Sequence, residues 1–486
     1  MSHHKPNPKK SVNLTIDGMP VSVPEGTTIL EAARRINVEI PTLCDHPDLH
    51  RRAVCRLCVV ESDGRGKLLA ACANSVSEGQ SIVTNNARIT GIRKTIVELL
   101  LANHPQDCLS CIRNTKCELQ SLAERYGIRE TSFRHQPLQR RQNEIASDTM
   151  VRDMDKCVKC GRCTDVCQEV QTIGAISTSH RSVNYEISTP YKQTLIDSSC
   201  IFCGQCVSVC PVGAIYEHDQ TAKVWEAIND NHKYVVAEIA APVLPALDEE
   251  FGLPPETITK GIMVTALKRM GFAHVYDAGY FAKLSAKEHV NELLGRIQYD
   301  DQPEKPKLPL ISCCSSGGIR FIEKFYPDLT EHLSFTKSPQ QLFASSLKGS
   351  HPNIITVSIL PCIARKFSSS GKAESKIHET AGFIEPDFIL TPREFAGMAR
   401  LAGIDFRELP KTDFDTLSAA SNIPAHNINL DEIIVKKTVV KGLGNARYIL
   451  DTIRRDKCDA ELVDIMCCPN DNCIGNEDCT INGFLQ

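Results

Sequence analysis

Residues 157–167 read C-V-K-C-G-R-C-T-D-V-C, and residues 200–211 read C-I-F-C-G-Q-C-V-S-V-C-P. Both stretches carry the spacing C-x2-C-x2-C-x3-C, which is typical of a domain that holds two [4Fe–4S] clusters, the fourth cysteine of each run binding the other cluster. The predicted ligand sets are Cys157, Cys160, Cys163 and Cys210 for one cluster, and Cys200, Cys203, Cys206 and Cys167 for the other. Zinc knuckles or disulfides are the alternative. The spacing favours a protein that transfers electrons.

Composition narrows the class of protein. The chain has 486 residues, 23 cysteines and a net charge of −4. Such a length predicts several domains. The N-terminal stretch MSHHKPNPKK lacks the apolar segment of a signal peptide, so the many thiols indicate metal ligation in a reducing compartment, and we expect a cytoplasmic protein. The sequence gives no reason to expect nucleic-acid binding or membrane insertion.

Residues 11–90 are predicted to form a separate [2Fe–2S] domain. Apolar residues alternate on either side of the turn Asp17-Gly18, and a helix is expected over Thr28–Ile36. A long loop and a later strand then supply four thiols, as in a ubiquitin-like fold, although their spacing differs from the plant type. A zinc site is the alternative. The predicted ligands are Cys44, Cys55, Cys58 and Cys72.

Residues 91–130 carry a second kind of pattern, H-x3-C-x2-C-x5-C. A neutral imidazole in place of one thiolate raises the potential of a cluster. The segment N-H-P-Q-D-C-L-S-C, like the domain before it, resembles the large subunit of respiratory complex I and the [FeFe] hydrogenases, which implies a [4Fe–4S] site. Its ligands would be His104, Cys108, Cys111 and Cys117, and we call this set the histidine-containing site. A polar linker over 131–149 is expected before a two-cluster ferredoxin domain at 148–220.

Residues 230–486 change in character. Apolar, strand-like stretches alternate with amphipathic helical ones, which predicts an α/β domain with mostly parallel strands. The predicted strands are Tyr234–Ile239, His274–Asp277, Leu308–Cys313, Ile354–Leu360, Phe388–Leu390, Ile433–Val440 and Leu462–Met466. The predicted helices include Ile262–Met270, Ala286–Ile297, Pro392–Leu401 and Asn445–Arg455. The cysteines at 313, 314, 362, 467 and 468 follow the carboxyl ends of three strands, where ligand sites of such domains lie.

This last region resembles the catalytic domain of [FeFe] hydrogenases. The stretches I-S-C-C-S-S-G-G at 311–318, S-I-L-P-C-I-A-R-K-F at 358–367 and D-I-M-C-C-P-N-D-N-C-I-G at 464–475 are similar to the three signatures of that family. S-P-Q-Q at 338–341 and L-T-P-R-E-F-A at 390–396 extend the match. We therefore expect a multidomain protein of the α+β and α/β classes, whose last domain is a shortened, two-lobed hydrogenase-like domain.

The resemblance implies particular roles in the C-terminal domain. A [4Fe–4S] cluster would be held by Cys314, Cys362, Cys468 and Cys473, with Cys467 and Cys479 as the nearest substitutes. In the family this cluster bridges to a diiron site. Cys313, Ser334 and Glu292 match positions that pass protons to it, and Arg365 and Ser338 match positions around the diiron cofactor. His289 stands where the family has a glutamate.

The departures from the family concern the diiron site. Ser315–Gly318 replaces a proline and a tryptophan, and Arg365 replaces a lysine, keeping the charge but not the compact ammonium. Glycine-rich segments that line the family's cofactor pocket are absent after Asp415. A cysteine-bound cluster tolerates such losses better than a buried site that must exclude water. We therefore expect no enclosed cavity beside Cys314, and an Arg365 that turns outward or pairs with a carboxylate.

Three functions follow from these observations. The first is an electron-conducting subunit with one [2Fe–2S] and four [4Fe–4S] clusters and no diiron site, working with flavin- or NAD(P)-binding and iron–sulfur partner subunits and with ferredoxin, for example in a formate dehydrogenase or an electron-bifurcating complex. The second is an active hydrogenase that interconverts protons and H₂. The third is a scaffold for cluster assembly, which would not need a row of clusters. K-G-L-G-N-A at 441–446 is too short a glycine signal for nucleotide binding.

Overall fold

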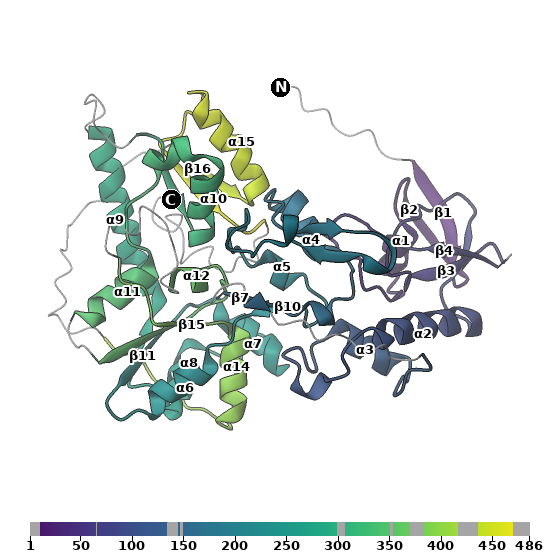
Figure 1. Ribbon diagram of the computed structural model, residues 1–486, viewed down its shortest axis with the longest axis horizontal. Coiled ribbons are helices and arrows are strands. Elements are labelled where there is room, and N and C mark those ends of the chain that lie inside the picture. Colours follow the sequence, from purple (N-terminus) through teal and green to yellow (C-terminus); the bar gives the residue numbers. More distant parts are fainter. Residues whose placement is uncertain are drawn as a thin grey trace.

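The computed structural model describes residues 10–64, 66–133, 144–145, 149–298, 307–349, 353–369, 383–416 and 436–469. Along the long axis of the molecule, a small β-rich part lies at one end, the cysteine-rich segments lie in the middle, and a larger α/β part lies at the other end (Figure 1). No helix in the described ranges is long and apolar enough to cross a membrane.

The N-terminal part is a five-stranded sheet in the order β2-β1-β5-β3-β4, with helix α1 packed on its apolar face. Asp17 and Gly18 both have positive φ, 49° and 80°, as a tight hairpin turn between β1 and β2 requires. Thr28 caps α1 in a capping box with Glu31. The elements are β1 (Ser11–Ile16), β2 (Met19–Pro24), α1 (Ile29–Arg35), β3 (Val59–Ser62), β4 (Lys67–Ala70) and β5 (Ser81–Val83).

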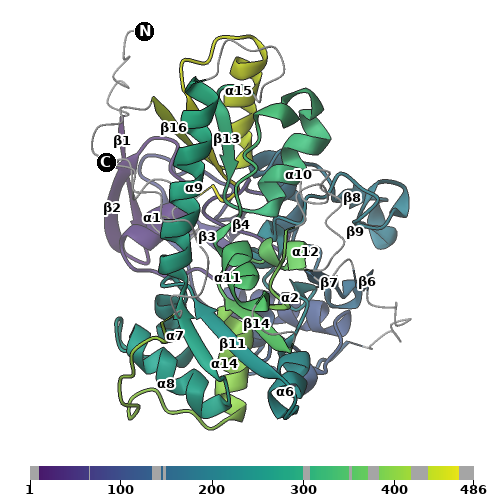
Figure 2. The ribbon, with the colours of Figure 1, turned by 90° about the vertical axis from the view of Figure 1, so that its left-hand side faces the viewer.

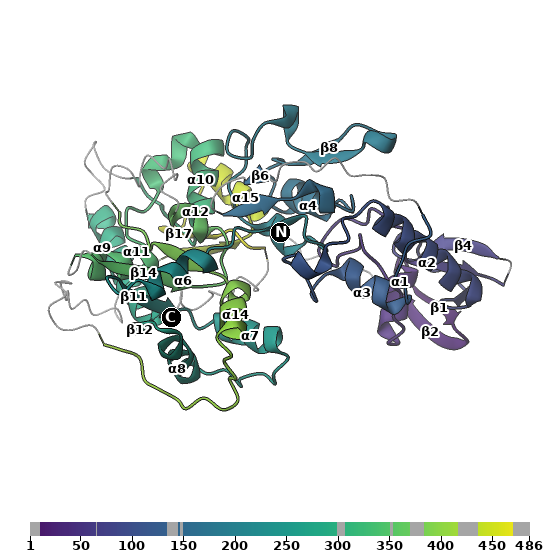
Figure 3. The same cartoon turned by 60° about the horizontal axis from the view of Figure 1, so that its bottom comes forward.

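The middle of the molecule holds two helices and a compact two-motif unit. Helices α2 and α3 pack together beside the N-terminal sheet (Figure 1). In the two-motif unit, short helices α4 and α5 each follow a left-handed glycine, Gly161 and Gly204. A β8–β9 hairpin lies between the motifs and projects from the surface (Figure 3). The elements are α2 (Ala87–Ala102), α3 (Glu118–Arg125), β6 (Glu144–Ile145), β7 (Met150–Arg152), α4 (Arg162–Asp165), β8 (Ser177–Ser179), β9 (Glu186–Ser188), α5 (Gln205–Ser208) and β10 (Ile215–Glu217).

The α/β part has two lobes, as the sequence predicted. Within the described residues each lobe contains a parallel sheet, one in the order β12-β11-β14-β15 and one in the order β13-β17-β16. Helix α9 connects the lobes, α12 lies between the two sheets, and α10 packs beside β13 (Figure 2).

The strands and helices of the first lobe are α6 (Thr221–Asn229), β11 (Tyr234–Ile239), α7 (Val243–Phe251), α8 (Lys260–Met270), β12 (His274–Asp277), α11 (Pro339–Lys348), β14 (Ile354–Ile359), β15 (Phe388–Leu390) and α14 (Pro392–Leu401). Those of the second lobe and its connections are α9 (Ala278–Gln298), β13 (Leu310–Cys313), α10 (Ser316–Phe325), α12 (Arg365–Ser369), β16 (Lys437–Lys441), α15 (Leu443–Arg454) and β17 (Leu462–Met466).

Candidate iron–sulfur sites

The second ferredoxin-type motif surrounds a cavity. Its lining includes four predicted ligands, Cys167, Cys200, Cys203 and Cys206, together with apolar side chains such as Ile173 and Ile201. Burial raises the pKa of Cys200 to about 11. Four thiols around one apolar cavity are the donor set that a [4Fe–4S] cluster requires, so the residues present fit that group.

The first motif repeats the same local geometry. Burial, together with the nearby thiols of Cys210 and Cys157, raises the pKa of Cys160 to about 12. The amide of Lys159 donates to Cys157 Sγ at 3.4 Å, and the amide of Phe202 donates to Cys200 Sγ at the same distance. Hydrogen bonds to cluster sulfurs raise the potential of a cluster. Cys157, Cys160, Cys163 and Cys210 therefore lie together, as the spacing predicted.

The four thiols of the N-terminal domain form two pairs. Cys58 Sγ and Cys72 Sγ are 3.4 Å apart, and their hydrogen bond lowers the pKa of Cys58 to about 7. The hydrogen bond with Cys44 likewise lowers the pKa of Cys55 to about 7, while it raises the pKa of Cys44. The long loop that the sequence predicted brings Cys44 and Cys55 beside the other pair, and this donor set fits a [2Fe–2S] cluster.

His104 is buried, and burial lowers its pKa, which favours a neutral imidazole. Its Nδ1 has no hydrogen-bond partner among the residues that the structure describes. An unpartnered buried nitrogen is unusual, and it fits a ligand of a metal cluster. Burial raises the pKa of Cys117, and the neighbouring thiols of Cys111 and Cys108 raise it further, so the three cysteines of this set also lie together.

The C-terminal site lies between the two lobes. Cys314 follows β13 and Cys468 follows β17 in one lobe, while Cys362 follows β14 in the other. Burial, together with the nearby Cys468 and Cys314, raises the pKa of Cys362 to about 12, which shows that the three thiols converge. Cys473 and Cys479 lie outside the described residues.

Arg365 corrects one expectation. It neither turns outward nor forms an ion pair with a carboxylate within the part of the chain that is described; its side chain is buried and donates to the carbonyl oxygen of Cys314. The guanidinium also counteracts the rise in the pKa of Cys362. A buried arginine therefore lies directly against the C-terminal cluster site.

Two of the residues that match the family's proton path, Ser334 and Glu292, are hydrogen-bonded to each other. Ser334 Oγ donates to Glu292 at 2.6 Å, and Arg296 and Thr336 also donate to this carboxylate, at 2.6 and 2.8 Å. Burial raises the pKa of Glu292, but the hydrogen bonds and the Arg296 charge outweigh burial and lower it overall. Ser338 caps α11 in a capping box with Gln341.

Cys313 has other acidic neighbours. It is partly buried, and burial together with the nearby Cys314, Asp464 and Glu323 raises its pKa well above the ordinary value. Asp464 begins the stretch at 464–475 that resembles the third signature, but it was not predicted as a site residue, because only the cysteines of that stretch were assigned roles. Burial raises its pKa to about 7, with Cys314 adding to the rise, and neither of its carboxylate oxygens has a hydrogen-bond partner among the described residues.

Three contacts between the sites were also missed. Gln205 Nε2 donates to Cys468 Sγ at 3.3 Å, which links the second motif to the C-terminal site. A Cβ at Gly204 would lie 2.8 Å from Ile363 Cβ, next to Cys362. Arg162, within the first motif, contacts both the Cys44 loop and the Cys117 segment. Such long-range partners leave no local pattern in the sequence.

Family profiles match successive parts of the chain. They are described as the 2Fe-2S iron-sulfur cluster binding domain (residues 9–87), the NADH-ubiquinone oxidoreductase-G iron-sulfur binding region (93–132), the 4Fe-4S dicluster domain (156–214) and the iron only hydrogenase large subunit, C-terminal domain (233–427 and 417–476). The chain thus contains [2Fe–2S] and [4Fe–4S] cluster-binding domains, followed by a hydrogenase-like α/β domain.

Curated relatives agree with this arrangement. The chain is 38% identical to the NADP-reducing hydrogenase subunit HndD of Solidesulfovibrio fructosivorans, over 84% of this chain and 72% of that protein. It is 30% identical to iron hydrogenase 1 of Clostridium pasteurianum, over 83% and 70%. The NADH-ubiquinone oxidoreductase 75 kDa subunit of Reclinomonas americana is 34% identical over 44% of this chain and 31% of its own length. The chain belongs to the iron-only hydrogenase large-subunit family.

Proposed function

We propose that this chain conducts electrons through a row of iron–sulfur clusters within a cytoplasmic, multi-subunit, NAD(P)-linked redox complex. One observation carries the proposal: predicted ligand cysteines of neighbouring sites share the same hydrophobic clusters. The first cluster includes Cys55, Cys117, Cys157 and Cys210. The next includes Cys157, Cys163, Cys167, Cys200, Cys206 and Cys210. The last includes Cys167, Cys200, Cys203, Cys314 and Cys467.

This shared packing supports a continuous path. Each hydrophobic cluster contains thiols from at least two adjacent sites, so the sites are in contact through close-packed side chains. When bound, the clusters supply one-electron redox chemistry. The chain's own contribution is to hold the sites in sequence and to keep water from between them. The resulting order is from the [2Fe–2S] site and the histidine-containing site, through the two ferredoxin-type sites, to the C-terminal site.

Two of the residues that match the family's proton path, Glu292 and Cys313, support the loss of the diiron chemistry. A proton carrier works best when its pKa lies near the working pH. The pKa of Glu292 is lowered and its carboxylate accepts bonds from Ser334, Thr336 and Arg296, so it is held ionised. A Cβ at Gly318 would lie 3.1 Å from Cys313 Sγ, so helix α10 packs tightly against this thiol. We therefore propose that the C-terminal domain holds one [4Fe–4S] cluster and no diiron site.

The partners follow from the chemistry that the chain lacks. Its matched profiles concern iron–sulfur clusters and the hydrogenase domain, so hydride or flavin chemistry would come from a flavin- and NAD(P)-binding subunit, with ferredoxin as a further electron carrier. The name of the HndD relative, a subunit of an NADP-reducing hydrogenase, supports such a complex.

An active [FeFe] hydrogenase is the second candidate function. The observation that favours it is the position of Cys313, which lies directly before Cys314 at the end of β13, where the family's proton-transferring cysteine stands. A partly buried thiol beside a cluster ligand could still serve this role if the pocket closes around a cofactor. Hydrogen evolution separates the two functions.

Iron content tests the conducting row. Anaerobic reconstitution of the full chain with iron and sulfide should reach about 18 iron atoms, as one [2Fe–2S] and four [4Fe–4S] clusters require. Cys362→Ala should lose about four of these and leave the spectra of the other clusters unchanged. Cys458→Ala is the matched control, because Cys458 belongs to no predicted ligand set, and it should keep the full iron content. A plateau at about ten iron atoms in the native chain, too few for five such clusters, would contradict the proposal.

A further inference from the structure

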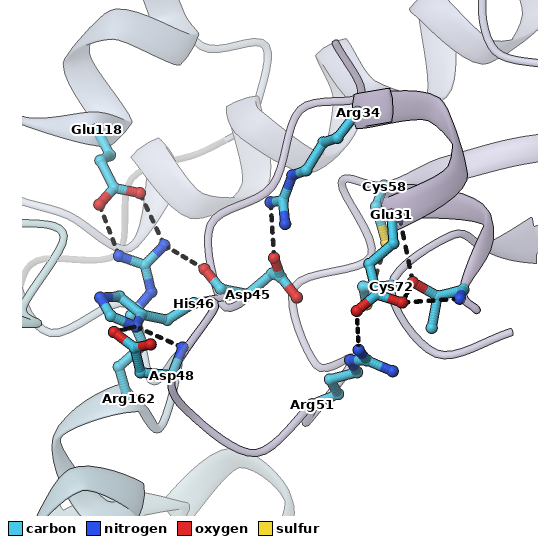
Figure 4. A network of polar contacts seen from close by, with 11 residues as sticks. Glu31, Arg34, Asp45, His46, Asp48, Arg51, Cys58, Cys72, Glu118 and Arg162 are labelled. Atoms are coloured by element: carbon cyan, nitrogen blue, oxygen red, sulfur yellow. Dashed lines mark hydrogen bonds and ion pairs between the residues drawn. The ribbon is translucent and has the colours of Figure 1, made fainter. Parts of the chain in front are cut away.

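Arg162 connects three cluster-binding segments with one side chain (Figure 4). It stands between Cys160 and Cys163 of the first ferredoxin-type motif. Its Nη2 donates to the carbonyl oxygen of Asp45, the residue after Cys44, at 2.9 Å. Its Nη1 and Nη2 donate to the two carboxylate oxygens of Glu118, the residue after Cys117, at 2.6 and 2.9 Å.

The geometry of this contact is specific. The Arg162 side chain is 7% exposed, whereas that of Glu118 is 45% exposed. A buried guanidinium is tolerated only when it is well paired, and a bidentate bond to a carboxylate fixes both the distance and the orientation of the two groups. The charge also lies close to the sites, because Arg162 stands between Cys160 and Cys163 and contacts the residue that follows Cys44.

A second arginine makes the reciprocal contact. Arg52, in the loop between Cys44 and Cys55, donates through Nε to both carboxylate oxygens of Asp165, each at 2.7 Å. It lies so close to the first motif that a Cβ at Gly161 would be 2.6 Å from its Cδ. The loop and the motif are thus joined in both directions, and Gly161 is required at a point of close approach as well as for its positive φ of 84°.

The corresponding position in the second motif makes a contact with the C-terminal site, at the other end of the row of sites. Gln205 follows Gly204 as Arg162 follows Gly161, and it donates to Cys468 Sγ in the C-terminal site. In both motifs, therefore, the residue after the glycine reaches out to the next cluster site. At the first motif two sites meet the ferredoxin unit, and a forked, charged side chain contacts both, whereas one amide suffices at the second.

We propose that Arg162 is the positioning residue of a junction at which the [2Fe–2S] site and the histidine-containing site both contact the first ferredoxin-type site. It holds the Cys44 and Cys117 segments at fixed distances from Cys160 and Cys163, and its charge favours the reduced form of the clusters around it. This inference rests on the proposed function, since it requires that the clusters are present.

The test uses Arg162→Gln and Arg162→Lys in the full, reconstituted chain. Both should keep the native iron content. In Arg162→Gln the electron paramagnetic resonance signal of the [2Fe–2S] cluster should lose the fast relaxation caused by reduced neighbouring clusters, and the midpoint potentials at the junction should shift downward. Arg162→Lys should restore the potentials but not the fast relaxation, because an ammonium cannot bond Glu118 in a bidentate manner and Asp45 at once.

Two controls separate the junction from general damage. Arg34→Gln removes a hydrogen bond of 2.8 Å to the carboxylate of the same Asp45, from a side chain that is 48% exposed, and should behave as the native chain. Gln205→Ala, at a residue that lines the second ferredoxin-type site and contacts the C-terminal site, should leave the junction unchanged. If Arg162→Gln does not fold, Glu118→Gln at the more exposed partner should still weaken the coupling of the cluster at the histidine-containing site.

Two results would overturn the inference: native relaxation and potentials in both Arg162 variants and in Glu118→Gln, or an equal change in Arg34→Gln. If the native chain never acquires its five clusters, the proposed function is contradicted instead. Measuring the iron content of the native chain before the variants are compared identifies that case.

Discussion

Glu238 is a fully buried carboxyl group on β11, in the core of the first lobe. Burial raises its pKa to about 8, although Ser358 Oγ donates to its Oε1 at 2.6 Å. In the unfolded chain a glutamate has a pKa of about 4.3. The folded protein therefore keeps a proton that the unfolded chain has already released between these values, and stability is lost as the pH rises through this window.

Glu238→Gln should remove this pH dependence, because the amide keeps the acceptor for Ser358 and carries no ionisable proton. From acidic pH to about pH 8, the native chain should lose up to about 1.4 kcal/mol of unfolding free energy per pH unit relative to the variant. Urea unfolding of the cluster-free chain at several pH values measures the difference.

Glu292→Gln is the contrasting control. The pKa of Glu292 is lowered, so this variant should lose about 1.5–3 kcal/mol at neutral pH. A Glu238→Gln variant that is less stable than the native chain at pH 8 would contradict the argument.

At the scale of single residues, the spacing predicted which candidate ligands lie together, whereas the residues that connect the sites could not be predicted. Metal-binding cysteines are recognisable by their spacing, because a cluster imposes its dimensions on a short loop. Cys362 and Cys468 needed the additional argument that strand ends meet. Arg162 and Gln205 gave no signal, since each acts on a segment at least 44 residues away in sequence.

Helix α10 shows how an element is adapted to a site. It begins at Ser316, immediately after Cys314 and Ser315, and its first turn contains Gly317 and Gly318. A Cβ at Gly318 would lie 3.0 Å from Cys313 Cβ and 3.2 Å from Cys467 Sγ, whereas a Cβ at Gly317 would meet its nearest atom at 3.5 Å, an ordinary contact. The second glycine thus permits the helix to approach Cys313 at the end of β13 and Cys467 just after β17.

Gly318→Ala should therefore destabilise the second lobe by about 1–3 kcal/mol through overpacking and should reduce loading of the C-terminal cluster. Gly317→Ala is the matched control: its methyl group fits, and helix propensity predicts a gain of up to about 1 kcal/mol. Thermal unfolding and iron content measure both effects. Equal behaviour of the two variants would show that the close approach to Cys313 has no energetic consequence.

The elements themselves were predicted well where local signals were strong. Strands β11, β12, β15 and β17 have the predicted bounds, and so does α14, whose Thr391-Pro392 start carries a capping box. Other boundaries differ, among them those of β13, α9 and β16. Strand β13 begins at Leu310 rather than Leu308, which precedes a proline. Helix α9 begins at Ala278 rather than at the predicted Ala286, because it follows β12 without an intervening loop. Strand β16 begins at Lys437, and residues 433–435 lie outside the described ranges.

At the scale of the whole molecule, the cluster sites are arranged along the long axis, from the N-terminal sheet to the region between the two lobes (Figure 1). The order of the sites along this axis follows their order in the sequence only in part. The first ferredoxin-type site is completed by Cys210 from the second motif, and the C-terminal site draws on both lobes. The spacing of the cysteines predicted each candidate ligand set separately. Whether the sites form a continuous row depends on packing between domains, which the spacing does not show.

Hydrogen evolution decides whether this row ends in a catalyst. The full chain, co-expressed with hydrogenase maturation proteins and supplied with a reduced low-potential viologen, should evolve no H₂, although the viologen reduces its clusters. Two physical reasons support this expectation: Glu292 is held ionised by Arg296, Ser334 and Thr336, and α10 packs against the thiol of Cys313. Infrared bands of iron-bound CO and cyanide should likewise be absent. As a control, the sample should have the native iron content and its clusters should be reduced by the viologen, which shows that it can accept electrons. H₂ evolution that disappears in Cys313→Ala would show instead that Ser315 to Gly318 can close around a diiron cofactor, and that the electrons carried along the molecule are used within this chain.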